Sequence, residues 1–93
     1  MKLLPTTLKK NGFIYTQIKR DGNACLYAQQ VAENLQYFEV FIPKVKAENV
    51  YKGKTFPERE VFPYDEDFGK SAWSCRTLED ALIRFNLLLS KNS

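Results

Sequence analysis

Three successive segments between Phe13 and Lys46 alternate with a two-residue period, and apolar side chains fall on both faces of the sheet that they predict. β-Branched and aromatic residues, which favour strands, are dense throughout this stretch. The sequence indicates only one amphipathic helix, at its C-terminal end. A single helix can cover only one of the two apolar faces, so the other face needs a different cover. This requirement constrains the fold more than any other feature.

The predicted sheet is an antiparallel meander of strands at Phe13–Lys19, Ala24–Val31 and Leu35–Lys46. Asp21-Gly22 joins the first two strands, and this pair favours a hairpin because a tight turn needs positive φ at its centre. Pro43 cannot donate to a strand ladder, so the third strand is expected to lie at an edge or to lose its pairing there.

A helix is predicted from Leu78 to Leu89. Thr77 supplies a hydroxyl N-cap, and two acidic residues in the first turn complement the helix dipole. Apolar residues recur at helical spacing, which predicts deep burial for Leu82 and Phe85. The segment Ser71–Cys75 is short enough to form a final strand before the helix.

These elements predict one α+β domain over residues 1–93, with an antiparallel sheet of three to four strands and one C-terminal helix on one face. A chain of this length leaves no room for a second independent core. Residues 1–12 are expected to form an N-terminal arm. Residues 47–70 are expected to form an aromatic-rich loop, with short strand character at Glu60–Phe62.

Two sets of side chains define the two faces. The helix is expected to cover Ile14, Ile18, Leu26, Phe38, Val40 and Ile42. The opposite face carries Tyr15, Gln17, Tyr27, Gln29, Tyr37 and Phe41. Three covers are open for this second face: the chain's own 47–70 loop, a second subunit or a ligand. The loop is favoured narrowly, because its own apolar residues also need burial.

The residue inventory excludes several chemistries. Histidine is absent, which removes histidine-dependent triads and metal sites. Cys25 and Cys75 form no CxxC pair and are expected to be reduced thiols. The acidic run at 65–67 is interpreted as a solvated turn, and Ser71 and Ser74 lack a nearby base. We therefore expect no enzyme, no cofactor and no metal.

The N-terminal residues lack the apolar run of a signal peptide, and no segment approaches the ~20 apolar residues of a membrane span. A cytoplasmic protein without membrane contact is expected. The net charge of +3 is small, but residues 1–54 carry nine basic and four acidic side chains, against five and seven in residues 55–93. The basic pairs fit a solvated rim or the margin of a phosphate-binding surface.

The expected function is a small non-enzymatic binding module, and the sequence leaves open whether its partner is nucleic acid or protein. Aromatic rings on an open sheet can stack on bases while basic side chains at the margin neutralise phosphates. The candidate surface for nucleic acid or a partner comprises Tyr15, Lys19, Arg20, Tyr27, Tyr37, Phe41, Lys44 and Lys46. Glu39 on the same face would repel a phosphate backbone. The alternative is a protein–protein interaction module or a homodimer.

Four segments carry a resemblance to a known group: Tyr37–Val40, Pro57–Glu60, Tyr64–Trp73 and Thr77–Ala81. They resemble small uncharacterised proteins encoded by phages and mobile elements of gut Bacteroidetes, which implies a mobile-element setting and, as one hypothesis, a nucleic-acid-associated accessory role in it. The order of three strands and a strand-to-helix junction is also similar to the plant ethylene-response type DNA-binding domain and to the amino-terminal domains of some transposon integrases. Those domains read DNA with the sheet, but their arginine and tryptophan spacing is missing here.

Overall fold

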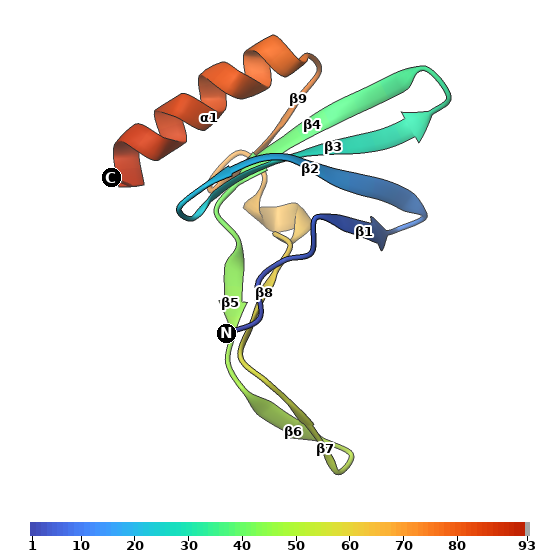
Figure 1. Ribbon diagram of the computed structural model, residues 1–93, viewed down its shortest axis with the longest axis vertical. Helices are drawn as coiled ribbons and strands as arrows, with labels where there is room; N and C mark the ends of the chain where they lie inside the picture. Colours follow the sequence, from blue (N-terminus) through green and yellow to red (C-terminus); the bar gives the residue numbers. More distant parts are fainter. Residues whose placement is uncertain (93) are drawn as a thin grey trace.

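A computed structural model describes residues 1–92; Ser93, the last residue of the predicted domain, lies outside the described residues. The fold is α+β, with a five-stranded antiparallel sheet, one C-terminal helix and a β-ribbon that projects away from the sheet (Figure 1). The sheet contains, in spatial order, β1 (Thr7–Lys10), β2 (Phe13–Asp21), β3 (Ala24–Ala32), β4 (Leu35–Phe41) and β9 (Ala72–Cys75). The helix α1 spans Leu78–Asn92. No helix in the described part of the chain is long and apolar enough to cross a membrane.

The α+β class and the C-terminal helix are confirmed, but the sheet has five strands rather than three to four. The extra strand, β1, lies within the segment predicted as an N-terminal arm. Asn11 and Gly12 join it to β2 with φ values of 54° and 83°, the positive φ that a two-residue hairpin turn requires. Asn-Gly is a strong hairpin signal, so this strand was accessible to prediction. The final strand expected at Ser71–Cys75 is present as β9 and pairs with β4.

Pro43 separates β4 from the next pairing, as its missing donor led us to expect. The predicted third strand is therefore split, and its last residues belong to a separate ribbon. The ribbon consists of β5 (Lys44–Lys46) paired with β8 (Arg59–Val61) and of β6 (Asn49–Tyr51) paired with β7 (Lys54–Phe56). Residues 47–70 are thus not one loop, since residues 49–56 form the outer hairpin of the ribbon and point away from the sheet (Figure 1).

The helix packs on one face of the sheet, over β3, β4 and β9. Its N-cap is confirmed, because the Asp80 backbone N–H donates to Thr77 Oγ1 at 3.1 Å. The buried residues of this layer are Ala24, Leu26, Val40, Ala81, Phe85 and Leu88. Leu82 is only partly buried, because it lies beside this stripe rather than at its centre.

Ile14 and Ile18 were predicted to lie under the helix, and both are exposed. The main packing of α1 is with β3, β4 and β9, so the β2 positions receive little cover from it. The register between β2 and β3 also shifts between Gln17 and Lys19, which takes Ile18 out of the regular alternation.

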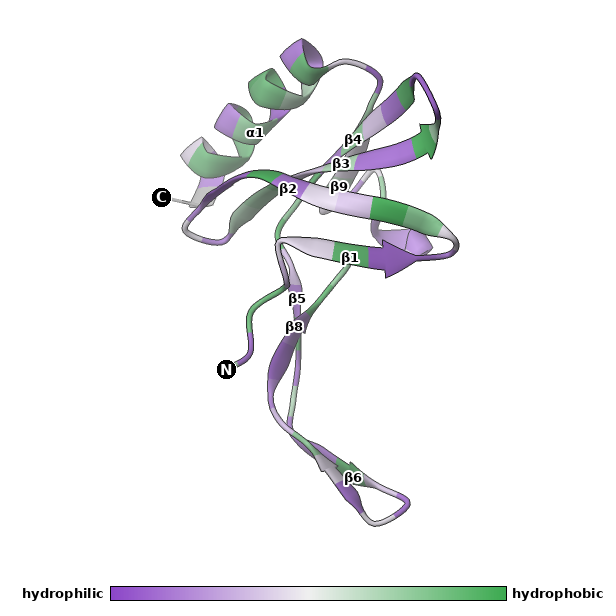
Figure 2. Cartoon of the chain, turned by 45° about the vertical axis from the view of Figure 1, so that its right-hand side comes forward, coloured by the Kyte–Doolittle hydropathy of each residue, from purple (hydrophilic) through white to green (hydrophobic). Residues whose placement is uncertain are grey.

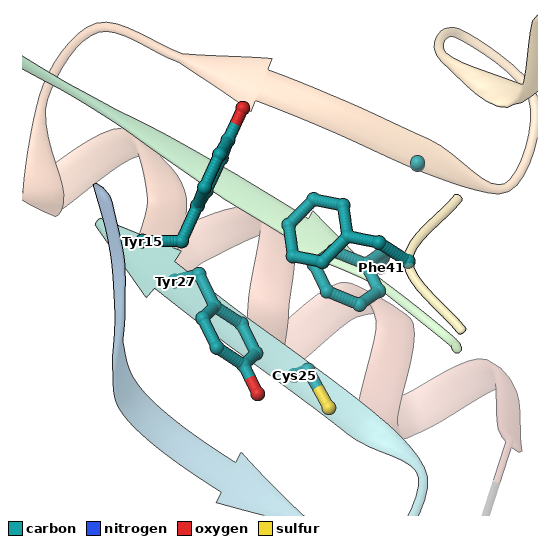
Figure 3. Packing of buried hydrophobic residues seen from close by; sticks show 6 residues of the cluster. Tyr15, Cys25, Tyr27 and Phe41 are labelled. Atoms are coloured by element: carbon teal, nitrogen blue, oxygen red, sulfur yellow. The ribbon is translucent and has the colours of Figure 1, made fainter. Parts of the chain in front are cut away.

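The opposite face of the sheet is covered by the chain itself. Tyr15, Tyr27 and Phe41 are 5%, 0% and 0% exposed and gather with Cys25 on this face (Figure 3). Phe62 lies among their rings, with its centroid 4.9 Å from that of Tyr15 and 4.5 Å from that of Phe41. The predicted self-cover is confirmed for these three rings, while Tyr37 is only partly buried.

The cover comes from two places in the sequence. Phe62 and Phe68 belong to the segment that follows the ribbon, and Leu4 and Leu8 belong to the N-terminal segment. The Tyr27 hydroxyl donates to the Pro5 carbonyl at 2.7 Å, which ties the N-terminal segment to β3. Both faces of the sheet are therefore core in the isolated chain.

Candidate functional site

The fold disperses the eight residues predicted as one binding surface. Tyr15, Tyr27 and Phe41 are in the core, so they offer no open platform on which a base could stack. Tyr37 is partly buried on the same face. Lys19 lies on the helix side of the sheet, where its Nζ is 5.3 Å from the ring centroid of Phe85. The sheet-face surface of the sequence analysis is therefore wrong as a stacking site.

Two of the predicted phosphate contacts are paired inside the molecule. The Arg20 guanidinium donates to both Glu60 carboxylate oxygens, at 2.6 and 2.7 Å. Lys44 Nζ lies 3.2 Å from Asp67 Oδ2 and 4.5 Å from the ring centroid of Tyr64. Lys46 is exposed on the projecting ribbon. Among the described residues, Lys46 is thus the one basic residue of the predicted set that neither forms an internal ion pair nor lies against the helix layer.

We call residues 44–59 the arm; Glu60 is left out because its side chain is buried against Arg20 in the body of the domain. The arm has five Lys or Arg and two Glu, a net charge of +3. The rest of the chain has nine basic and nine acidic side chains, so the whole net charge of the protein resides on the arm. Figure 2 shows strongly hydrophilic segments along the arm, interrupted by an apolar one at β6.

The arm also exposes apolar side chains close to its turn. Val50 and Tyr51 are 68% and 61% exposed. The turn itself is formed by Lys52 and Gly53, both with positive φ, and Lys52 Nζ lies 5.4 Å from the Tyr51 ring centroid. The Val50 and Tyr51 side chains thus lie exposed at the end of a two-stranded hairpin, an element that is marginally stable by itself.

A cavity of about 290 Å³ lies between the sheet and the segment that covers it. Its apolar walls are the rings of Phe13, Tyr15, Phe62 and Phe68. Its polar lining consists of Lys10, Asn11, Gln29, Glu39, Asp65 and Ser74. These residues come from all five strands of the sheet, a hairpin turn and the covering segment, so tertiary packing fixes their relative positions.

Glu39 is the buried charge of this cavity, with 6% of its surface exposed. Burial raises the pKa of its carboxyl to about 7, against a smaller lowering by the charge of Lys10. Its Oε2 has no hydrogen-bond partner among the residues that the structure describes. Glu39 was predicted as a charge on an open sheet face, and this was wrong because the segment around Phe62 buries this face.

Both cysteines are free thiols. Cys25 lies in the core opposite the helix, and Cys75 packs against the helix layer, so the sheet separates them. Burial raises the pKa of Cys25 to about 11 and also raises that of Cys75. Among the described residues, no three or more His, Cys, Asp or Glu side chains are placed so that they could hold a metal ion together.

Comparison of the chain with protein-family models, with curated proteins and with solved structures finds no match. The site therefore has to be judged on its own residues. Tyr51, Lys52 and Lys54 were not among the predicted site residues, although Lys52 and Lys54 form one of the basic pairs of the sequence. Their signal was a Lys-Gly pair between two short alternating segments, which is compatible with a hairpin turn.

Proposed function

We propose that the protein is a non-enzymatic binding module that contacts nucleic acid with its arm. The observation that carries the proposal is the coincidence of the whole net positive charge with the one segment that projects from the sheet. Lysine and arginine contacts to phosphates supply most of the sequence-independent affinity for DNA. A two-stranded ribbon also fits the major groove of B-DNA, so duplex DNA is the form of nucleic acid that the arm suits best.

The arm residues take different roles in this proposal. Lys46, Lys52 and Lys54 are exposed and form no ion pair within residues 1–92, so their ammonium groups are available to phosphates. Val50 and Tyr51 lie beside the turn and enter the groove or stack on an unpaired base. The contact surface is thus the arm and not the sheet face, whose rings are buried. The proposal includes an accessory role in a mobile element, and the sequence resemblance is the only support for that part.

A protein partner, including a second copy of the chain, is the second candidate. The exposed Val45, Val50 and Tyr51 favour it, because apolar and aromatic side chains fill the centres of protein interfaces. Pairing of two arms would bring two segments of charge +3 together, however, and like charges across an interface oppose binding. A polyanion meets the same arm without this repulsion, so nucleic acid is the first candidate.

An electrophoretic mobility assay with single- and double-stranded oligonucleotides, at two salt concentrations, tests the proposal. Wild type is expected to retard duplex DNA at the lower salt concentration and to release it at the higher one. The variant K52Q/K54Q is expected to bind weakly. The matched control K9Q/K91Q removes two exposed lysines outside the arm and is expected to bind like wild type.

Sedimentation of the same proteins separates the second candidate. A homodimer would show a concentration-dependent mass that salt does not change, and Tyr51→Ser would disturb it more than K52Q/K54Q. Absence of any retardation at the lower salt concentration, together with such a dimer, would overturn the nucleic-acid proposal in favour of self-association.

A further inference from the structure

The cavity beside Glu39 has the size and the lining of a small-molecule site and opens to solvent on the side of the exposed Asp65. Its volume of about 290 Å³ is close to the lower end of the range for small-molecule sites, ~300–1,000 Å³. Four aromatic rings form its walls, and a few polar groups converge on it. None of its lining residues belongs to the arm, so the cavity is a separate site.

Glu39 supplies the strongest polar signal in the cavity. It comes from the middle of β4, where it is opposite Tyr27 of β3 and Ser74 of β9 in the strand register. Its Oε2 is buried and receives no hydrogen bond from any described residue. A buried carboxyl oxygen without a donor costs free energy. A ligand that donates hydrogen bonds to Glu39 would remove this cost.

The charged groups around the cavity determine which sign of charge a ligand should carry. Glu39 and Asp65 are two carboxyl groups, against the single ammonium group of Lys10. Lys10 Nζ already donates to the Pro63 carbonyl at 3.2 Å and lies 5.0 Å from the ring centroid of Phe62. With both carboxylates ionised, one negative charge is left over. A monovalent cation balances it, whereas an anion would meet two carboxylates.

The walls suit the same ligand. Aromatic faces attract cations, and ammonium groups bound among several rings are a recurrent arrangement in proteins. Phe13, Tyr15, Phe62 and Phe68 supply four rings here. The remaining volume accommodates a small apolar body attached to the charged head.

We propose that this cavity binds the ammonium group of a small organic amine, with Glu39 as its counter-ion and the four aromatic rings as its walls. Charge pairing with Glu39 is favoured because this carboxyl group is buried. The proposal is independent of the arm, and K52Q/K54Q is expected to bind the amine as wild type does.

The protonation of Glu39 gives this site a pH dependence. Burial raises the pKa of Glu39 to about 7, whereas an alkylammonium ion resembles a lysine side chain, with a pKa of ~10.4. Amine affinity should therefore rise between about pH 6 and about pH 8, as Glu39 becomes a carboxylate. Lys10, Asp65 and the Tyr15 hydroxyl line the same cavity, and the charge of Glu39 also acts on the Cys75 thiol of β9, so Glu39→Gln is needed to isolate its contribution.

The experiment uses three probes of similar shape and different charge: 2-phenylethylamine, 2-phenylethanol and phenylacetate. Calorimetry or NMR titration of the full chain at about pH 8 is expected to show the amine binding at least about tenfold more tightly than the alcohol, with phenylacetate weakest. Glu39→Gln is expected to remove the advantage of the amine. The alcohol should bind wild type and variant equally, which shows that the cavity is still folded.

Four outcomes would overturn the proposal. Equal affinity for amine and alcohol would mean an apolar cavity without charge selection. Tighter binding of phenylacetate would make Lys10 the anchor. Unchanged amine affinity in Glu39→Gln, or no binding of any probe, would remove Glu39 from ligand recognition. If the variant fails to fold, the rise of amine affinity between about pH 6 and about pH 8 in wild type decides instead.

Discussion

Arg20 and Glu60, forty positions apart in the sequence, form a bidentate ion pair with N–O distances of 2.6 and 2.7 Å. Glu60 Oε1 also accepts the Leu4 backbone N–H at 3.1 Å. These contacts join β2, β8 and the N-terminal segment at the base of the arm. Arg20, predicted from the sequence as a phosphate contact, therefore positions the arm instead of meeting a ligand.

Arg20→Ala should lower the free energy of unfolding by about 3 kcal/mol, because it leaves the Glu60 carboxylate buried without its partner. The double variant R20M/E60L should recover much of this loss. Lys9→Ala, at an exposed position, should change stability by less than ~0.5 kcal/mol. Urea denaturation measures all four proteins, and an Arg20→Ala loss no larger than that of Lys9→Ala would contradict the assignment.

The same pair predicts a pH dependence. Arg20 and the Leu4 N–H hold the pKa of Glu60 below its usual range. The contribution of Glu60 to stability is then present above its unfolded pKa of ~4.3 and is lost as the pH falls through the lower pKa of the folded state. The difference between wild type and Arg20→Ala should accordingly shrink in acid; a difference that stays constant would indicate a cause other than the ion pair.

Glu39→Gln should stabilise the protein at neutral and higher pH. The pKa of Glu39 is raised to about 7, so the folded state binds more protons than the unfolded state between the unfolded value near ~4.3 and about 7. Wild-type stability therefore falls as the pH rises through this window, by roughly 1–3 kcal/mol, and the glutamine variant is spared this loss. Denaturation midpoints at about pH 4 and about pH 8 test this, and parallel pH profiles would refute it.

The helix face makes a fourth prediction. Phe85 is fully buried between α1 and the sheet, and Phe85→Ala should cost about 3–5 kcal/mol. Ile83 lies on the same helix with more than half of its surface exposed, so Ile83→Ala should cost far less. Comparable losses in thermal or chemical denaturation would mean that the helix packs with a different face.

The cysteines should differ in reactivity. Cys75 is partly buried, whereas Cys25 is fully buried and its pKa is raised to about 11. A thiol reagent should therefore modify Cys75 first and reach Cys25 only on unfolding, because the thiolate is the reactive form. Mass spectrometry of the Cys75→Ser variant supplies the control. Rapid labelling of Cys25 in that variant would show that the layer of Tyr27, Phe41 and Phe62 opens readily.

The elements that local patterns determine were predicted well. A two-residue period placed Tyr15, Tyr27 and Phe41 on one face, and Thr77 marked the start of the helix. Both signals act over a few residues and leave a direct trace in the sequence.

The features that depend on distant partners were not predicted. The pairing of Arg20 with Glu60, the burial of Glu39 and the division of residues 47–70 into a ribbon and a cover all require tertiary contacts. A bulge after Gln17 likewise takes Ile18 out of the regular alternation, and no glycine in the sequence marks the position of this bulge. The candidate binding surface was wrong for the same reason. The alternation of side chains shows which residues share a face of the sheet, but not which segment of the chain covers that face.

The salt dependence of binding to a duplex DNA oligonucleotide tests the central claim most directly. Fluorescence anisotropy across a salt series gives the slope of log affinity against log salt, which is ~0.9 for each phosphate neutralised. The slope of K52Q/K54Q should be shallower than that of wild type by about 2, while K9Q/K91Q should keep the wild-type slope. Equal slopes for the arm variant and wild type, or an equal reduction in both variants, would contradict the arm as the nucleic-acid contact.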